Sequence, residues 1–293
     1  VGKVLDPGSR LDAYYADQRV TLARVVRPSL NYTYFNMEDP VVGGYAPVQV
    51  ALRRAVTMGF NVPDLIRVWW QGQAIVATQP IPPDVAGHDP RLDVRAPYDV
   101  ATARSLLDRF GYRDRDGDGW RDLPDGRPFT LSMGSTPTNR DRERDELWKR
   151  SMKDLGIRID FVKQKFPDLL RMGRAGQLQM WPVGWITSYG EGDAFMQLLY
   201  SGNIGQSNYS RFRNDEYDDL YRRSKRIPDG PERTALYGRM AAIVAAYAPW
   251  ELGAYTYENT LVRPWVRGYV KHVSWEHPWK YHDLDVAAQR TGR

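Results

Sequence analysis

Residues 157–185, IRIDFVKQKFPDLLRMGRAGQLQMWPVGW, hold a strand, a helix and a second strand in succession. Apolar and polar side chains alternate over residues 157–162, which predicts a half-buried strand. A helix is predicted over residues 166–174, and a second strand over residues 178–185 leads into a polar, glycine-rich turn. Strands that alternate with helices in this way predict an α/β domain with a mixed β-sheet flanked by helices.

The rest of the sequence continues this alternation. The first 25 residues are polar and weakly patterned, and we expect a fraying lead-in there. Residues 79–97 are rich in proline and are expected to form an extended loop, whereas residues 252–285 are an aromatic, β-rich tail. The other predicted strands are residues 32–36 and 129–133, and the other predicted helices are residues 48–59, 61–70, 98–110, 142–155, 215–226 and 231–246.

The composition excludes several classes of protein. Hydrophobic residues make up 42% of the 293 residues and charged residues 26%, which is typical of a folded globular protein. The net charge of +5 comes from interleaved acids and bases rather than from a basic stripe or tail, so we expect no nucleic-acid partner. Cysteine is absent, which excludes disulfides and a cysteine nucleophile, and no apolar run approaches the ~18 residues of a membrane span.

The residues that enzymes use do not form a recognisable pattern. The four histidines are His88, His272, His277 and His282, and the last three are spaced by five in a β-like segment. A helical zinc pair needs a spacing of four, and a pair on one face of a strand needs an even spacing. The sequence contains no GxSxG, Walker A or HExxH motif. We therefore expect a protein that is not an enzyme and that requires no cofactor.

Residues 114–125, DRDGDGWRDLPD, have the spacing of a calcium-binding loop. Acids stand at positions one, three, five, nine and twelve, glycine stands at six, and position seven would supply its carbonyl oxygen. Position twelve is Asp rather than the usual Glu, and a strand is predicted to follow. A turn whose aspartates cap their own backbone explains the same residues. The candidate calcium ligands are Asp114, Asp116, Asp118, Trp120, Asp122 and Asp125.

The candidate ligand-binding segment is residues 184–195, GWITSYGEGDAF. It leaves an apolar strand and presents two aromatic side chains, hydroxyls and carboxylates on a turn that contains glycine. Ligands of open α/β sheets bind at such strand ends. Taken alone, the segment is explained as well by an ordinary strand-to-helix connection. The candidate ligand-binding residues are Trp185, Ser188, Tyr189, Glu191 and Asp193.

Six segments resemble, in the same order, the extracellular solute-binding proteins of family 5, the oligopeptide, dipeptide, nickel and haem receptors of ABC importers. They are YFNMEDP with VQVALRRAVTMGFN, GQAIVATQPIPP, YDVATARSLLDRFGYRDRDGDG, GW at Gly184 and Trp185, FRNDEYDDL, and the helix that ends AAYAPW. The resemblance implies a periplasmic-binding-protein type II-like lobe. It also implies the substrate-binding component of an ABC importer, which captures a peptide or peptide-like solute and delivers it to the permease.

Members of that family are longer and have two lobes that close over the ligand, so the resemblance implies a fragment. Residues 1–30 would be a lead-in from the missing N-terminal lobe, residues 31–257 the second, ligand-binding lobe, and residues 258–293 a return segment toward the first lobe with the C-terminal tail. The expected partners are the solute and the transmembrane subunits of the permease. We expect a monomer in the periplasm, with the signal peptide outside this chain.

The sequence departs from the family pattern at one position, and two alternative functions stay open. In peptide-binding members, an Asp three residues after the Trp of this turn binds the α-amino group of the ligand. Ser188 has that place here, and Glu191 or Asp193 are the candidates to replace the charge. A carbohydrate-binding or carbohydrate-active protein would have one of these acids opposite a second acid across a cleft. An interaction domain without a ligand would show an apolar patch without a concavity.

Overall fold

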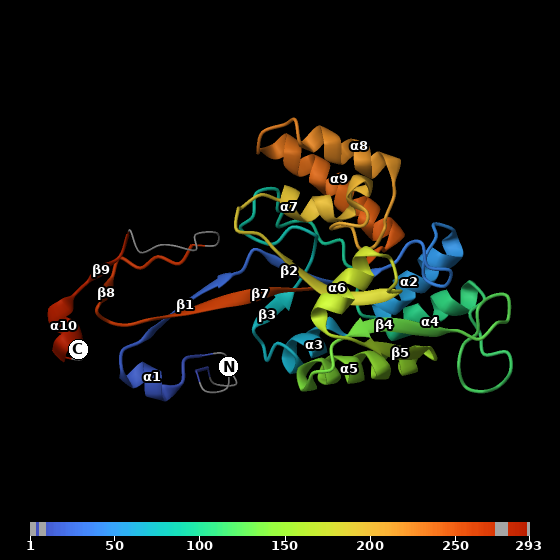
Figure 1. Cartoon of the computed structure of the whole chain (residues 1–293), viewed down its shortest axis with the longest axis horizontal. Helices are drawn as coiled ribbons and strands as arrows, with labels where there is room; N and C mark the ends of the chain where they lie inside the picture. The colour runs from blue at the N-terminus through green and yellow to red at the C-terminus, as the bar shows by residue number, and fades with distance from the viewer. Residues whose placement is uncertain (1–3, 6–9, 273–280, 292–293) are drawn as a thin grey trace.

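The computed structural model describes residues 4–5, 10–272 and 281–291, and its centre is a mixed β-sheet (Figure 1). Within these residues, seven strands form that sheet in the spatial order β1–β7–β2–β6–β4–β5, with β3 paired to β7 beside this path. The strands are β1 (Thr21–Val26), β2 (Ser29–Phe35), β3 (Ala74–Val76), β4 (Thr130–Ser135), β5 (Arg158–Lys163), β6 (Met180–Ile186) and β7 (Trp250–Val262). A short second sheet pairs β8 (Val266–Arg267) with β9 (Asp283–Leu284).

Helices cover both faces of the main sheet. The helices that cover it are α2 (Pro47–Gly59), α3 (Val62–Val68), α4 (Val100–Arg109), α5 (Asn139–Leu155), α6 (Phe166–Arg174), α7 (Asp193–Met196), α8 (Asp215–Ser224) and α9 (Pro231–Tyr247). The helices α1 (Ala13–Asp17) and α10 (Val286–Thr291) lie apart from these two layers (Figure 1). The short 3-10 helices η1 (Gln197–Leu199) and η2 (Ser201–Asn203) follow α7. This architecture confirms the predicted α/β fold with a mixed sheet flanked by helices.

The sheet is parallel at one end and antiparallel at the other. Met133 of β4 lies opposite Phe161 of β5 and Met180 of β6 in parallel registers. Beyond them, β6 runs antiparallel to β2, and β2 runs antiparallel to β7. The carboxyl ends of β4, β5 and β6 therefore lie at the same edge of the sheet.

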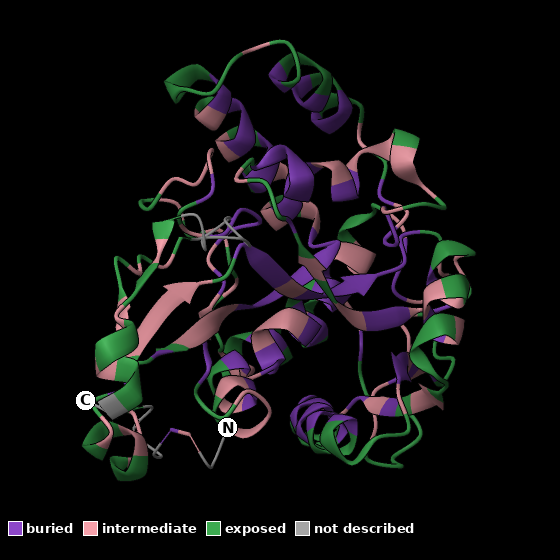
Figure 2. Cartoon of the chain, turned by 60° about the vertical axis from the view of Figure 1, so that its left-hand side comes forward, coloured by how far each residue is buried: buried purple, intermediate pink, exposed green. Residues whose placement is uncertain are grey.

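Each face of the sheet carries its own hydrophobic core. Tyr34 of β2 belongs to the core formed with α6, α7, α8 and α9. The next residue, Phe35, belongs to the core formed with α2, α3, α4 and α5. Successive side chains of a strand point to opposite faces, so the central strand β2 is buried on both sides. Figure 2 shows this buried centre in purple between the two helical layers.

Capping residues explain where several helices begin and end. The side chains of Asn61 and Thr138 accept backbone N–H groups at 3.0 and 3.1 Å and so begin α3 and α5. Because Thr138 is the cap, α5 starts three residues before the predicted residue 142. It ends at Gly156, whose φ of 73° lies in the left-handed region that favours glycine.

The predicted fraying lead-in was wrong where α1 and β1 form. β1 pairs with the distal half of β7, with Thr21 opposite Val262 and Val26 opposite Tyr257. The partner strand is remote in the sequence, since the side chain of Arg24 donates to that of Asn259, 235 residues later, at 2.7 Å. A local pattern carries no information on such a distant partner, and for this reason the strand was missed.

β1 and the distal half of β7 form a two-stranded ribbon that projects from the body of the molecule (Figure 1). The ribbon is mostly half-exposed, unlike the buried centre of the sheet (Figure 2). β8, β9 and α10 lie beyond it (Figure 1). Within the predicted return segment, residues 273–280, which include His277, lie outside the described residues.

Arg53 is a buried cation at the junction of α2, α9 and β7. Its guanidinium donates to the carbonyl oxygens of Val42, Gly44, Tyr247 and Ala248 at 2.6 to 3.2 Å, and the side chain is fully buried. Two of these carbonyls close the carboxyl end of α9, where a positive charge is favourable. Burial lowers the pKa of Arg53 to about 10, so the group remains charged at neutral pH.

Replacing Arg53 by Leu is expected to lower the free energy of unfolding by about 3 kcal/mol or more, because four buried carbonyls lose a charged donor. The matched control is Arg54→Leu, since Arg54 is the next residue of α2 and is exposed. For that control we expect a loss below about 1 kcal/mol. Urea unfolding followed by tryptophan fluorescence measures both changes, and equal losses would contradict the role given to Arg53.

Candidate functional site

β4 and β6 diverge toward their carboxyl ends. Their register joins them at Met133 and Met180, whereas β4 and β5 stay paired from Thr130 to Ser135. The chain then leaves the two strands toward opposite faces of the sheet. β4 continues into α5 on one face, and β6 continues into α7 on the other. Neighbouring strands whose connections part in this way define a topological switch point, where open α/β sheets bind their ligands.

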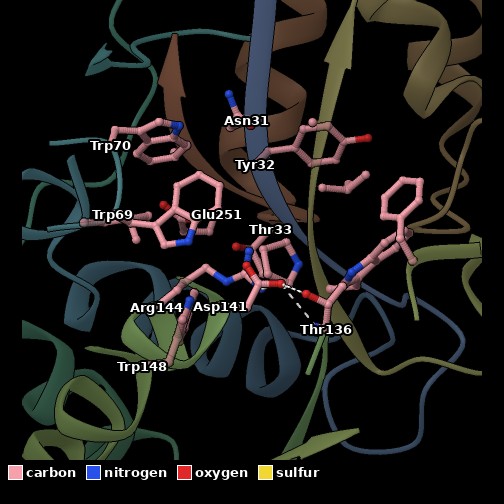
Figure 3. A pocket seen from close by; sticks show the side chains of 17 residues that line it. Asn31, Tyr32, Thr33, Trp69, Trp70, Thr136, Asp141, Arg144, Trp148 and Glu251 are labelled. Atoms are coloured by element: carbon pink, nitrogen blue, oxygen red, sulfur yellow. Dashed lines mark hydrogen bonds and ion pairs between the residues drawn. The ribbon is translucent and has the colours of Figure 1, made fainter. Parts of the chain in front are cut away.

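A pocket of about 160 Å³ opens at this switch point (Figure 3). Strands β2, β6 and β7 contribute its floor, and residues of α3, α5 and the start of α6 contribute its walls. Six aromatic residues line it, namely Tyr32, Trp69, Trp70, Trp148, Phe166 and Trp181. Such rings offer contact area to apolar groups and their faces to cations. The concavity argues against an interaction domain that has only an apolar patch.

Glu251 lies on the floor of the pocket, in β7 directly opposite Thr33 of β2. Its side chain is almost fully buried, at 2% exposure, and its Oε1 atom has no hydrogen-bond partner. Burial raises the pKa of this carboxyl group from 4.5 to about 7, and the hydrogen bond with Thr33 opposes that rise in part. The group therefore changes its charge near neutral pH.

Asp141 and Arg144 of α5 form a charged wall of the pocket. The guanidinium of Arg144 lies 3.3 Å from the Asp141 carboxylate, and both side chains are buried. The backbone N–H and the hydroxyl of Thr136 donate to the same carboxylate (Figure 3). Asp141 is thus satisfied, whereas Nε of Arg144 and Nε1 of Trp69 are buried without a hydrogen-bond partner.

The turn predicted from the sequence leaves the same edge of the sheet beside this pocket. The lining of the pocket reaches Gly184, which lies in β6 and is the first residue of the segment 184–195. Trp185 is half-buried against the core that contains α7, α8 and α9. Ser188 and Tyr189 are exposed. The backbone N–H of Gly192 donates to a carbonyl of the proline-rich loop at 2.8 Å, which fixes the end of the turn.

The two acids of the turn are engaged in ion pairs. The buried Asp193 accepts a hydrogen bond from Nζ of Lys225, at the end of α8, at 2.7 Å. The exposed Glu191 lies 3.7 Å from a guanidinium nitrogen of Arg233 in α9. Both acids therefore face α8 and α9 rather than the pocket. This arrangement does not favour the carbohydrate-active alternative, which requires one of them opposite a second acid across a cleft.

The candidate calcium loop lies at the opposite, amino end of β4. Carboxylate oxygens of Asp114, Asp116 and Asp122 lie within 4.8 Å of one another. The loop also closes itself, since Asp114 accepts from the backbone N–H groups of Gly117 and Gly119 at 2.7 and 2.9 Å.

Two other carboxylates of the candidate calcium set have cationic partners. Asp118 pairs with Arg158, and Asp125 pairs with Arg127. The full ligand set, with the carbonyl of Trp120, therefore stays a prediction.

The sequence reasoning missed Glu251 and the two tryptophans after α3. Their segments are far apart in the chain, and the pocket exists only because β2 lies between β6 and β7. One signal was present, because Glu251 is an acid between the apolar residues Trp250 and Leu252, directly before the predicted β-rich segment 252–285. A charged side chain rarely occupies a buried strand unless it has a partner or a function.

A helical α/β lobe with a pocket at a switch point is the architecture of a domain that binds small solutes. The family model for bacterial extracellular solute-binding proteins, family 5 Middle, matches residues 5–207. The chain belongs to this family. That membership confirms the family and the type of lobe implied by the sequence, and it groups the chain with binding proteins rather than enzymes.

Individual relatives agree with this assignment. Heme-binding protein A of Haemophilus influenzae is 28% identical over 258 residues, which are 87% of this chain and 44% of that protein. Di/tripeptide-binding protein 2 of Pseudomonas aeruginosa is 27% identical over 203 residues, 68% of this chain and 36% of that protein. The chain thus spans less than half the length of these two relatives.

A solved structure shows the same fold. The oligopeptide-binding protein AppA of Bacillus subtilis, in complex with a nonapeptide, matches with a TM-score of 0.75 and 20% identity. The match covers 90% of this chain and 52% of that one. Among the helices of the described residues, none has both the length and the apolar character needed to cross a membrane.

Removing divalent cations is expected to leave the melting temperature unchanged, because the loop of residues 114–125 is closed by its own hydrogen bonds. Differential scanning fluorimetry before and after EDTA, and then with added calcium, measures the effect. A sharp fall in melting temperature that calcium reverses would show instead that the metal is structural.

Glu251→Gln is expected to flatten the pH dependence of stability between pH ~4.5 and ~7. In this range the unfolded wild-type chain releases a proton that the folded chain retains, so wild-type stability falls as the pH rises and stays low above pH ~7. The raised pKa corresponds to a loss of wild-type unfolding free energy on the order of 3 kcal/mol above pH ~7, relative to pH ~4.5. The variant should therefore be the more stable protein at pH 8 and similar to wild type near pH 4.5.

The matched control is Glu258→Gln, the same substitution on the same strand at a residue that pairs with Lys271 outside the pocket. Denaturant unfolding at a series of pH values measures all three proteins. The control should keep the wild-type dependence of unfolding free energy on pH. If Glu251→Gln keeps it as well, Glu251 does not titrate in the way described.

Proposed function

We propose that this chain is the ligand-binding lobe of the substrate-binding component of an ABC importer, which captures a peptide or peptide-like solute. The observation that carries the proposal is the aromatic pocket at the switch point between β4 and β6. Membership of family 5 supports the importer assignment. The peptide class is supported by the di/tripeptide-binding relative and by the peptide complex of AppA.

The pocket supplies one wall of the binding site. Its volume of about 160 Å³ is below the ~300–1,000 Å³ of typical small-molecule sites, so a peptide would fill it only in part. We assign residues 31–257 to the second lobe, and residues 1–30 and 258–293 to segments that run to and from a first lobe. The projecting β1–β7 ribbon supports this division.

Closure of the two lobes would exclude water from the solute and complete its contacts. The exposed Ser188 and Tyr189 of the turn after β6 would then contact the solute beside the pocket, while Trp185, Glu191 and Asp193 hold the turn in place. Binding in this way needs no cofactor. The proposal includes a monomer in the periplasm that delivers the solute to the transmembrane subunits of a permease.

Trp70→Ala is expected to weaken peptide binding by about 1–3 kcal/mol, as for other aromatic anchors, because Trp70 lines the pocket. The matched control is Trp120→Ala, in the loop at the opposite end of β4, which should bind like wild type. Isothermal titration of the full-length protein with a panel of di- and tripeptides measures the difference. The panel is chosen after native mass spectrometry of protein purified without denaturation.

Four results bear on this proposal. Loss of binding in Trp70→Ala alone supports the pocket, whereas equal affinities of both variants and wild type contradict it. A Trp185→Ala variant tests the turn separately, and wild-type affinity there would remove the turn from the site. The 293-residue chain by itself should bind more weakly than the full-length protein, because a solute held by one wall buries less apolar surface.

A further inference from the structure

A groove of about 240 Å³ lies beside β7, apart from the switch-point pocket. Trp250 and Leu252 line the groove, whereas Glu251 between them lines the pocket. Successive side chains of a strand point to opposite faces, so the side chains that line the two sites leave β7 in opposite directions. The other walls of the groove come from α2, the end of α9 and residues 94–96. Solute capture at the switch point leaves this groove without a role.

The inner wall of the groove is apolar and buried. Val244 of α9 is 2% exposed, and Trp250 and Leu252 are 4% and 7% exposed. The ring of Trp250 packs against the ring of Tyr32, with the ring centres 4.1 Å apart, so this wall is already formed. The half-buried Met58 of α2 continues the apolar surface. A preformed apolar wall of this kind favours a hydrocarbon group.

Two guanidinium groups stand at the rim of the groove, those of the exposed residues Arg54 and Arg95. Within the described residues Arg54 forms no ion pair, and one of its N–H groups donates to the carbonyl oxygen of Ala245 at 3.2 Å. Arg95 lies 2.9 Å from Asp93 in an exposed ion pair, which contributes little and is easily exchanged. Among the described residues that line the groove there is no acid. The charge of the rim is therefore complementary to a negatively charged group.

Thr57 of α2 lines the groove with a hydroxyl group that has no hydrogen-bond partner, although its Oγ1 atom is buried. A threonine hydroxyl within a helix commonly bonds a carbonyl of the preceding turn, and this bond is absent here. Buried polar atoms in folded proteins are nearly always hydrogen-bonded. The groove thus contains a donor that a negatively charged oxygen would satisfy, in addition to the two guanidinium groups.

We infer that this groove is a second binding site, for a small amphipathic carboxylate. The head group lies between Arg54 and Arg95, and the hydrocarbon chain lies along the inner wall. A guanidinium binds a carboxylate through two parallel hydrogen bonds, which gives the head group a fixed orientation. At ~30 Å³ for each water molecule, the groove equals about eight waters, which suits a short hydrocarbon chain rather than a long-chain lipid.

The test uses octanoate as the probe, with 1-octanol and acetate as matched controls for the head group and the chain. Isothermal titration of the full-length protein at pH 7.5 is expected to show one octanoate site. 1-Octanol should bind at least about tenfold more weakly, because it lacks the charge that strengthens the hydrogen bonds of the guanidinium groups. Acetate should show no saturable binding, because it buries almost no apolar surface.

Arg54→Gln and Arg95→Gln are each expected to weaken octanoate binding by about tenfold and to leave peptide binding at the switch point unchanged. The matched control is Arg91→Gln, since Arg91 is exposed and lies in the same loop as Arg95 but outside the groove. That control should bind octanoate like the wild-type protein. A melting curve of each variant confirms that it is folded, and the comparison of the three probes requires no variant.

The possible results separate this inference from the proposed function. Absence of saturable octanoate binding overturns the inference and leaves peptide capture intact, as does equal binding of octanoate and 1-octanol. Equal losses in Arg54→Gln and Arg91→Gln overturn it as well. Weaker octanoate binding in Trp70→Ala, or competition by peptides, would move octanoate to the switch-point pocket and contradict a second site.

One further comparison concerns the first lobe. If the 293-residue chain binds octanoate and the full-length protein does not, the first lobe occupies the groove and the inference fails. If octanoate binds as described while no peptide of the panel binds, the proposed function fails and the second site stands.

Discussion

The contacts of Arg53 fix the point at which the chain passes from α9 into β7. Five hydrogen bonds from one buried guanidinium join the loop before α2 to the end of α9, where Ala248 has a left-handed backbone conformation. β7 begins two residues later, and Glu251 is its second residue. The position of Glu251 on the pocket floor therefore depends on the charge of Arg53, which lies far earlier in the sequence. Arg53 and its hydrogen-bond acceptor Ala248 are 195 residues apart.

The divergence of β4 and β6 converts this framework into a site. Because the chain leaves the two strands toward opposite faces, their carboxyl ends stay open between the two hydrophobic cores. Aromatic rings from the residues after α3 and from α5, α6 and β6 surround the opening, and the carboxyl group of Glu251 lies on its floor. Each face of the sheet carries a hydrophobic core. Of the ten buried side-chain polar atoms without partners in the described residues, three belong to residues that line the pocket, namely Trp69, Arg144 and Glu251. Polar groups left without hydrogen-bond partners in a pocket are typical of functional sites.

Local patterns predicted the elements whose signals are local. Helices with a cap or a terminal glycine, such as α3 after Asn61 and α5 before Gly156, were predicted with small errors in their bounds. β1 was missed because its pairing with β7 is a long-range contact. The turn that contains Ser188 and Tyr189 was predicted to follow a strand, and it does follow β6, yet the pocket beside it was not foreseen. Its residues come from segments that only the sheet order brings together, and Glu251 was overlooked as an ordinary acid.

The central claim is that the switch point between β4 and β6 is the wall that holds the solute. A crystal structure of the full-length protein with its co-purified solute tests it most directly. The account predicts electron density for the solute between Thr136, Gly184 and Glu251, with a group of amino-acid size inside the pocket. Density for the solute at another place, for instance in the groove lined by Arg95 and Trp250 on the molecule, with the switch-point pocket filled by water, would contradict it.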